Sequence, residues 1–328
     1  MENIHDKLRK CQPIVEDLLK ISGSPGFAIG AYQHGKIVHE DYYGLRDVEK
    51  KLPVNRDTIF HVASLTKAIT AAGVGILVDR GDLDWSTPVE DILPFFKDNT
   101  AEKSKLTVSD FLSHRTGITW GDALYLQSNN NLMLSKSESM RTFQYLPTVA
   151  APRSRLLYNN HAYNIPGLVI EELAKQPYGE FLQDNIFGPL NMARTFTRNP
   201  DDPNVAVPYK ILSNGTSFQI LFSEASSDTI MLSAVSVRTT MADILHLYGA
   251  MLEKLSALIP RERPHNARDA DVPSRCHGVV MASGPDSTDS GPGTTNPIKQ
   301  VNQLFRPHIA KNADTLYEQM VALGWMRT

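Results

Sequence analysis

The sequence predicts an α/β (α+β) fold in which an antiparallel sheet flanked by helices joins a mostly helical domain. Two apolar runs, residues 27–32 and 36–43, are separated by His34-Gly35, which is typical of a β-hairpin. Residues 68–78 carry no charged side chain, and an uncharged run of this length indicates a helix that is buried on most sides. Helical periodicity recurs as far as residue 255, so most of the later structure should be helical.

The individual elements follow from local signals. Residues 4–21 have the apolar spacing of one amphipathic helix, and the glycines and proline of residues 23–26 end it. Gly81 should cap the buried helix. Further helices are expected to start near residues 85–89, with Ser86 or Thr87 as the cap, and near 106–112. Others are expected to run from residues 156–163 to Leu173, over 178–187, and over 236–255 with Thr239 or Thr240 as the cap.

A chain of 328 residues can bury a large core in one or two domains. Residues 1–63 should supply the N-terminal helix and the first strands of the α/β domain. Residues 64–255 should form the mostly helical domain, starting at the helix that carries Ser64. Residues 256–297 become rich in Pro, Gly, Ser and charged side chains, which predicts a flexible insertion, and residues 298–328 form a return segment.

Composition and charge narrow the functional classes. The chain is 41% hydrophobic and 21% charged with a net charge of −3, as in ordinary globular proteins, and no basic stripe predicts a nucleic-acid or membrane partner. Cys11 and Cys276 fit neither a disulfide framework nor a zinc site, and the histidines form no metal motif, so we expect no metal or other cofactor. The N-terminus lacks the apolar region of a secretion signal, which predicts a cytoplasmic protein.

Ser64 and Lys67 form the only Ser-x-x-Lys of the chain and immediately precede the uncharged helix. Their spacing puts both side chains on one helix face. A serine hydroxyl becomes a nucleophile when a base takes its proton, and a lysine whose pKa is lowered by burial can be that base. The start of the helix would also offer N–H groups to an oxyanion. The alternative is that Ser64 caps the helix and Lys67 lies on the surface.

Further stretches occur in a fixed order along the chain. Residues 77–83 read Leu-Val-Asp-Arg-Gly-Asp-Leu, residues 112–118 read Leu-Ser-His-Arg-Thr-Gly-Ile, residues 158–160 read Tyr-Asn-Asn, and residues 186–192 read Ile-Phe-Gly-Pro-Leu-Asn-Met. With the Ser-x-x-Lys, they resemble the serine beta-lactamase and penicillin-binding-protein-like superfamily. The resemblance is to its class C beta-lactamase, esterase and transesterase branch (peptidase S12-like), including fungal members that act on small metabolites. It covers nearly the whole chain up to Trp325 and implies a beta-lactamase/transpeptidase-like fold.

The resemblance also implies roles for four residues. Ser64 matches the acylated nucleophile, and Lys67 matches its partner in proton transfer. Tyr158 matches the general base or acid that faces the serine, with its phenolate favoured by Lys67. Asn160 matches the residue that hydrogen-bonds Lys67 and the substrate. Taken alone, Tyr158 is better interpreted as a core tyrosine and Asn160 as a helix N-cap, whereas their register with Ser64 and Lys67 favours the functional roles.

The chain departs from the family pattern in several places. Pro152-Arg153-Ser154 replaces the usual Pro-Gly, Pro166 replaces an aliphatic residue, and Ala234-Val235 stands where Gly-Gly is common. After Tyr158 there is no Lys-Thr-Gly, Lys-Ser-Gly or His-x-Gly, the third motif of the family. We therefore expect a C-terminally truncated chain that lacks the strand bearing the second oxyanion N–H, and also the C-terminal helix.

Two functions are consistent with these observations. The first is a serine hydrolase or acyltransferase that forms an acyl-Ser64 intermediate on a small ester, thioester or amide and tailors a secondary metabolite. Its partners would be the small-molecule acyl substrate and, for transfer, an acceptor alcohol. The second is a catalytically inactive or incomplete remnant that acts as a binding protein. In either case, a hairpin edge left open by missing strands would favour self-association.

Overall fold

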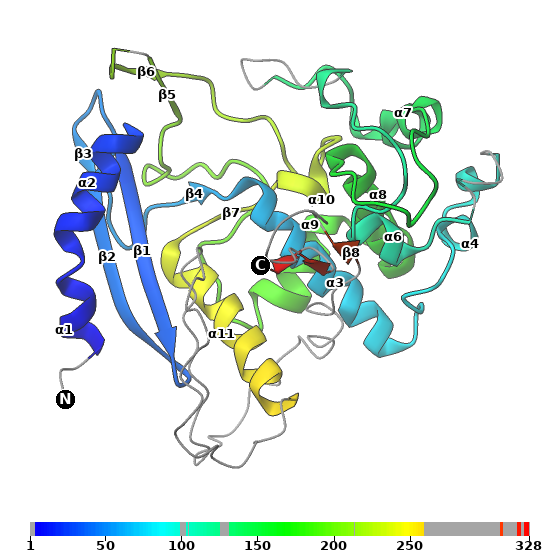
Figure 1. Cartoon of the computed structure of the whole chain (residues 1–328), viewed down its shortest axis with the longest axis horizontal. Helices are drawn as coiled ribbons and strands as arrows, with labels where there is room; N and C mark the ends of the chain where they lie inside the picture. The colour runs from blue at the N-terminus through cyan, green and yellow to red at the C-terminus, as the bar shows by residue number, and fades with distance from the viewer. Residues whose placement is uncertain are drawn as a thin grey trace.

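The computed structural model describes residues 4–98, 103, 105–124, 131–212 and 214–258, together with three short strands at 309–310, 320–322 and 325–327. Figure 1 shows the N-terminal sheet with its helices on one side of the molecule and a cluster of helices around α3 on the other. Residues 259–308 and 311–319 lie outside the described residues. The predicted flexible insertion at 256–297 falls almost entirely there.

The N-terminal sheet confirms the predicted hairpin and extends it. Strands β1 (Gly26–Gln33) and β2 (Lys36–Asp47) pair antiparallel, and β3 (Leu52–Pro53) pairs with β2 to give the order β1-β2-β3. The hairpin turn is His34-Gly35, with φ values of 50° and 77°. Two residues with positive φ match the right-handed twist of the flanking strands, which is why this turn joins them without splaying the strands.

The expected single helix over residues 4–21 is wrong, because the chain forms two helices. Helix α1 (Ile4–Arg9) and helix α2 (Gln12–Ser22) are separated at Lys10 and Cys11. Pro13 lies in the first turn of α2, where its missing N–H costs nothing, so it starts a new helix instead of continuing the old one. Of the expected apolar side, Val15 is buried and Leu18 is exposed.

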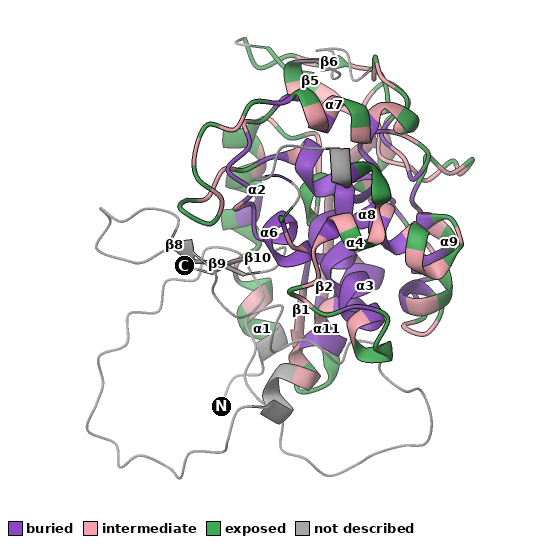
Figure 2. Ribbon diagram, turned by 90° about the vertical axis from the view of Figure 1, so that its right-hand side faces the viewer, coloured by how far each residue is buried: buried purple, intermediate pink, exposed green. Residues whose placement is uncertain are grey.

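The helix after Ser64 is buried, as predicted. A 3₁₀ turn, η1 (Ala63–Leu65), leads directly into α3 (Thr66–Arg80). Every residue of α3 from Thr66 to Leu77 is buried, and Figure 2 shows α3 and α8 among the most buried elements. Gly81, at φ 82°, ends α3 in the left-handed conformation that glycine adopts freely. Ser64 therefore lies in the first turn as expected, although that turn is 3₁₀ and not α-helical.

The remaining helices surround α3. They are α4 (Val89–Ile92), α6 (Val108–Leu112), α7 (Ser139–Tyr145), α8 (Asn160–Ala174), α9 (Tyr178–Leu182), α10 (Leu232–Val235) and α11 (Met241–Leu258). The expected helix over 178–187 divides into α9 and a π-helical segment, η5 (Gln183–Phe187). The cap expected at Ser86 or Thr87 is also wrong, because the extended residue before α4 is Pro88.

Three short 3₁₀ segments and two small strand pairs complete the elements before residue 258. The 3₁₀ segments are η2 (Pro94–Asp98), η3 (Asp122–Leu124) and η4 (Lys136–Glu138). Strand β4 (Phe60–His61) pairs with β7 (Arg238–Thr239), and β5 (Tyr209–Ile211) pairs with β6 (Ser217–Gln219). Later in the chain, β8 (Ile309–Ala310), β9 (Met320–Ala322) and β10 (Trp325–Arg327) form a separate antiparallel sheet. Whether the chain lacks further strands, as expected, stays a prediction.

Helix α11 joins the two parts of the structure. It packs against β1 and β2, and α3, α8 and α10 pack on one another beside it (Figure 1). A Cβ added at Gly30 of β1 would lie 2.6 Å from Leu245 Cδ1, so the strand and the helix approach closely because this position has no side chain. Thr240 caps α11 as predicted, since its Oγ1 accepts the N–H of Asp243 at 3.2 Å.

Candidate active site

Ser64 lies on an exposed turn that is held from both sides. The β4–β7 pair fixes the chain before it, and the Val62 N–H donates to the Val237 carbonyl at 3.1 Å. Ala63 has φ 44°, a left-handed conformation that is uncommon for a residue with a side chain. Such strain persists where the surrounding structure holds the backbone in place, and it is found disproportionately at functional sites.

Lys67 is 3% exposed, and its ammonium group has three acceptors. Nζ lies 3.1 Å from Ser64 Oγ, 2.8 Å from Asn160 Oδ1 and 2.9 Å from the Ala234 carbonyl oxygen. Burial lowers the pKa of Lys67 to about 7, although the negative charge of Asp122 acts in the opposite direction. The alternative interpretation, in which Lys67 lies on the surface, is therefore wrong. A neutral Lys67 could donate to Asn160 and Ala234 and still accept the Ser64 hydroxyl proton.

Tyr158 faces Ser64 from the opposite side. Its Oη lies 2.7 Å from Ser64 Oγ, and Lys67 Nζ lies 4.9 Å from the centre of its ring. The side chain is 46% exposed, which argues against a core tyrosine. Burial of the phenol raises its pKa, the hydrogen bond to Ser64 lowers it, and Asp122 raises it further. The expected phenolate is thus disfavoured, and Lys67 is the group whose pKa lies closer to neutrality.

Asn160 contacts Lys67, as the resemblance implies, and it is not the helix cap. The cap of α8 is Asn159, whose Oδ1 accepts the Ala162 N–H at 2.9 Å. Asn160 is the first residue of the helix, so its side chain is available to Lys67. The same amide donates from Nδ2 to Asp122 Oδ2 at 2.7 Å. The structure therefore brings Ser64, Lys67, Tyr158 and Asn160 together in one hydrogen-bonded cluster.

His114 packs against the ring of Tyr158, a role that the sequence did not predict. Its ring centre lies 4.4 Å from that of Tyr158 and 5.1 Å from that of Tyr163. Its Nδ1 accepts the Asn159 N–H at 3.2 Å. Burial, and secondarily the charge of Lys67, lower its pKa to about 3, so the imidazole is neutral near pH 7. The presence of His114 in the 112–118 motif was the one sequence signal for this role. Asp122, whose role the sequence also did not predict, belongs to none of the motifs.

The structure also accounts for two departures from the family pattern. Arg153 has φ 67°, a conformation that favours glycine, and its guanidinium forms an ion pair with the buried Asp110 at 2.8 Å. That ion pair anchors the loop leading to Tyr158 and offsets the backbone strain. At Ala234, the contact to Lys67 is made by the main-chain carbonyl, so a glycine is not required for it. For Pro166, which lies inside α8, we have no physical account.

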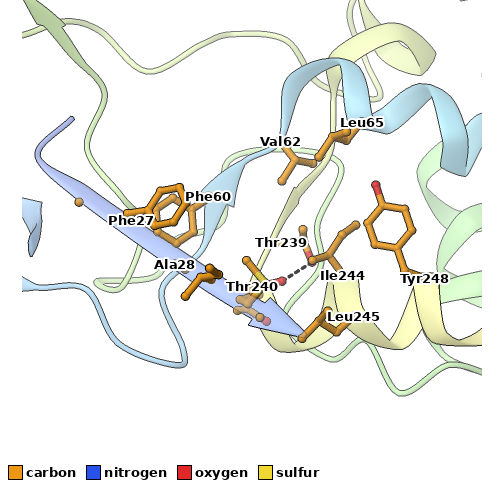
Figure 3. A pocket seen from close by; sticks show the side chains of 14 residues that line it. Phe27, Ala28, Phe60, Val62, Leu65, Thr239, Thr240, Ile244, Leu245 and Tyr248 are labelled. Carbon is orange, nitrogen blue, oxygen red and sulfur yellow. Dashed lines mark hydrogen bonds between the residues drawn. The ribbon is translucent and has the colours of Figure 1, made fainter. Parts of the chain in front are cut away.

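An apolar groove of about 430 Å³ lies next to the Ser64 turn (Figure 3). Its lining includes Phe27, Phe60, Val62, Leu65 and Tyr248. The five consecutive residues 26–30 of β1 also line it, and because neighbouring strand residues point to opposite faces, the groove must run along the strand edge. Among the described residues β1 pairs with β2 alone. The predicted self-association through an open edge of the hairpin, which would be the edge of β1, stays a prediction.

A glycine near the site permits a test of the loop that carries Arg153. Gly117 has φ 78°, and a Cβ there would lie 2.2 Å from the Ala150 carbonyl oxygen. Gly81 has φ 82° with nothing within 4 Å of its Cβ position. We expect Gly81→Ala to cost about 1 kcal/mol, the cost of left-handed backbone alone, and Gly117→Ala to cost distinctly more. Urea unfolding would measure both, and equal losses would show that the Gly117–Ala150 contact is relaxed.

Within the residues that the structure describes, no group of three His, Cys, Asp or Glu side chains is placed to hold a metal ion. A search of the same residues finds no helix both long and apolar enough to span a membrane.

Helices packed around a buried Ser-x-x-Lys helix, with an antiparallel sheet beside them, define a beta-lactamase/penicillin-binding-protein-like fold. The chain belongs to the beta-lactamase family: the family model described as Beta-lactamase matches residues 12–297. Members of this family are serine hydrolases.

Two similar proteins illustrate the range of this family. The "Unguisins hydrolase ungD" of Aspergillus violaceofuscus is 30% identical over 193 residues, which are 57% of this chain and 34% of that protein. "Protein flp" of Staphylococcus aureus (strain MW2) is 29% identical over 196 residues, which are 58% of this chain and 38% of that protein. The chain thus matches little more than a third of either relative's length.

Solved structures show the same fold. An octameric penicillin-binding protein homologue from Pyrococcus abyssi matches 97% of this chain and 64% of its own, with a TM-score of 0.74 and 19% identity. The D-alanine carboxypeptidase AmpC from Burkholderia cenocepacia matches 75% of this chain and 65% of its own, with a TM-score of 0.62 and 23% identity. At these identities the likeness establishes the fold alone.

Proposed function

We propose that this chain is a serine hydrolase that forms an acyl-enzyme at Ser64 on a small ester, thioester or amide. The observation that carries the proposal is the position of Ser64 Oγ between Lys67 Nζ at 3.1 Å and Tyr158 Oη at 2.7 Å. A nucleophile within hydrogen-bond reach of its base, with the base oriented by a further group, is the arrangement that covalent catalysis requires. Asn160 supplies that orientation by accepting from Lys67.

In the proposed reaction, Lys67 and Tyr158 exchange one proton on either side of Ser64. Ser64 Oγ attacks the substrate carbonyl carbon while neutral Lys67 takes the hydroxyl proton, which gives a tetrahedral intermediate. Tyr158, whose raised pKa keeps it protonated, donates its proton to the leaving group and regains one from Lys67. The carbonyl–heteroatom bond breaks and leaves an acyl-Ser64 ester. Water then attacks this ester, with the same pair managing its proton, and releases the acid.

The start of η1 supports binding of the oxyanion. N–H groups in the first turn of a helix have no acceptor within the helix, and the Ser64 N–H lies in such a turn. The expected absence of a second donor concerns a strand beyond the described residues and stays a prediction.

The substrate class rests on the site and on one relative. The apolar groove beside Ser64 favours an acyl group with an apolar portion. The Aspergillus relative is named as a hydrolase of unguisins, which favours hydrolysis over transfer to an alcohol; tailoring of a secondary metabolite stays a prediction.

Burst kinetics with a chromogenic ester test the proposal. With p-nitrophenyl acetate, the chain should release close to one equivalent of p-nitrophenolate quickly and then turn over more slowly, because we expect the activated ester to acylate Ser64 faster than water hydrolyses the acyl-enzyme, which then accumulates. Ser64→Ala is the matched control and should abolish both phases. A chain that binds acyl compounds without a burst or turnover would instead be the non-catalytic binding protein.

The acylation rate should rise with pH through about 7. Neutral Lys67 is the base, and its pKa of about 7 means that the reactive form is a minority below this pH and dominates above it. The burst rate measured from pH 5 to 9 checks this expectation. An acylation rate that falls as the pH rises through 7 would mean that Lys67 acts in its protonated form.

A further inference from the structure

Asp122 lies behind Asn160, on the side away from Lys67. It is the first residue of η3, and its Oδ2 accepts the Asn160 Nδ2–H at 2.7 Å. The oxygen of the same amide accepts from Lys67 Nζ at 2.8 Å. A carboxylate is thereby connected to the lysine through one amide group, and the lysine in turn contacts Ser64.

The chemistry of the three groups decides which way the amide points. An ammonium group has only donors and an ionised carboxylate has only acceptors, whereas an amide has an oxygen on one side and an NH₂ group on the other. Only one of the two orientations of the Asn160 amide satisfies both neighbours. Reversing it would point NH₂ at the ammonium and oxygen at the carboxylate, which would remove both of these hydrogen bonds and place groups of like polarity against each other.

The charges near Lys67 make Asp122 the main electrostatic influence on it. Within the part of the chain that the structure describes, the uncharged titratable groups near Lys67 are the phenols of Tyr158 and Tyr163, with Nζ 4.9 Å and 5.3 Å from their ring centres, and the imidazole of His114. The pKa of each phenol is raised and that of the imidazole is lowered, so all three are neutral near pH 7. Asp122 is the described carboxylate whose charge raises the pKa of Lys67, and it also raises the pKa of Tyr158.

We propose that Asp122 is a positioning residue for the reaction at Ser64: it holds the Asn160 amide with its oxygen on Lys67, and it places a carboxylate behind the lysine. The proposal rests on the proposed function for its kinetic consequences and on the structure alone for its effect on Lys67. Asp122 does not touch the reacting atoms; it acts through Asn160.

The negative charge of Asp122 shifts the pKa of Lys67 upward. A carboxylate stabilises the protonated form of a nearby lysine, so Asp122 opposes the lowering of the Lys67 pKa by burial. Removing the charge should lower the Lys67 pKa further and move the rise of the acylation rate to lower pH. Above both pKa values the rate should still fall, by as much as about 10²-fold, because Lys67 and Asn160 lose their fixed geometry.

The test follows Lys67 directly by NMR titration of ¹³Cε-labelled lysine in the full chain. Lys67→Met identifies the Lys67 signal by its loss. Asp122→Asn removes the charge at nearly constant volume, and Asp122→Ser provides a second uncharged variant in case the first does not fold. Asp122→Glu keeps the carboxylate. Asp201→Asn is the matched control, since it removes one exposed carboxylate elsewhere on the chain. Burst kinetics with p-nitrophenyl acetate across the pH range accompany each variant.

We expect Lys67 to titrate near pH 7 in the native chain and in Asp201→Asn, at lower pH in the uncharged Asp122 variants, and nearer the native value in Asp122→Glu. A folded Asp122→Asn or Asp122→Ser chain in which Lys67 titrates as in the native chain would overturn the proposal. The two proposals fail separately. If the native chain shows neither a burst nor a turnover that depends on Ser64 at any pH, the hydrolase proposal fails, and the NMR titration still decides the role of Asp122.

Discussion

Replacing Lys67 by methionine is expected to slow acylation of Ser64 by about 10²–10⁴-fold while the chain stays folded. Lys67 is the group that can take the serine proton, because burial brings its pKa to about 7 and Nζ lies 3.1 Å from Ser64 Oγ. Methionine has a similar length without an ionisable group, so the loss would report the base and not the volume. The burst rate above pH 8 is the measurement, with circular dichroism as the check on folding.

Tyr158→Phe tests the second residue that exchanges a proton with Ser64. It removes one hydroxyl and keeps the ring that packs on His114. We expect a loss of similar order alone, and a double variant with Lys67→Met that loses far less than the product of the two, because residues that handle one proton act together. Fully multiplicative losses would mean that Lys67 and Tyr158 do not share the proton.

Removing the Asp110 carboxylate is expected to have the largest effect on stability. Asp110 is fully buried, and it pairs with Arg153 at 2.8 Å and Arg115 at 3.4 Å. It also accepts the Thr107 N–H at 2.9 Å in the capping box of α6. Breaking a buried pair by removing one partner typically costs about 3–5 kcal/mol. We expect Asp110→Ala to lie near the lower limit, about 3 kcal/mol, because Arg153 is half exposed and can be hydrated.

An exposed ion pair is the matched control for that experiment. Asp228 lies 3.6 Å from Arg198, and both side chains are largely exposed. Exposed pairs contribute about 0–1 kcal/mol, so Asp228→Ala should change the free energy of unfolding by no more than that. Urea unfolding of both variants provides the comparison. Equal losses would show that the Asp110 cluster is hydrated and does not anchor the loop that carries Arg153.

The elements that the sequence predicted correctly are those with a strong local signal. The β1–β2 hairpin follows from two apolar runs around a turn that accepts positive φ, and α3 follows from an uncharged run that Gly81 ends. The break between α1 and α2 was missed because the apolar spacing continues across it, whereas Pro13 starts a new helix there. The apolar spacing alone predicts one continuous helix here, but Pro13 favours the first turn of a helix, so the chain begins a second helix at Gln12.

The residues of the site also divide into those that a local sequence pattern predicts and those that it does not. The spacing of Ser64 and Lys67 and the Tyr-x-Asn motif indicated four residues, which the structure brings into one cluster. Asp122 and His114 reach the same cluster only through tertiary contacts, from segments with no periodic relation to it. The pKa order of Lys67 and Tyr158 also depends on burial, which a sequence pattern does not report. The sequence alone therefore predicts these four residues of the site, whereas the distances between them and the order of their pKa values follow only from the folded structure.

The most direct test of the central claim is to locate the acyl group. The full chain is incubated with a beta-lactam or an activated ester, its intact mass is measured, and the adduct is mapped by peptide mass spectrometry. We predict one acyl group per chain, on the peptide that contains Ser64, and none in Ser64→Ala. An adduct on another serine, or one that persists in Ser64→Ala, would contradict the assignment of Ser64 as the nucleophile.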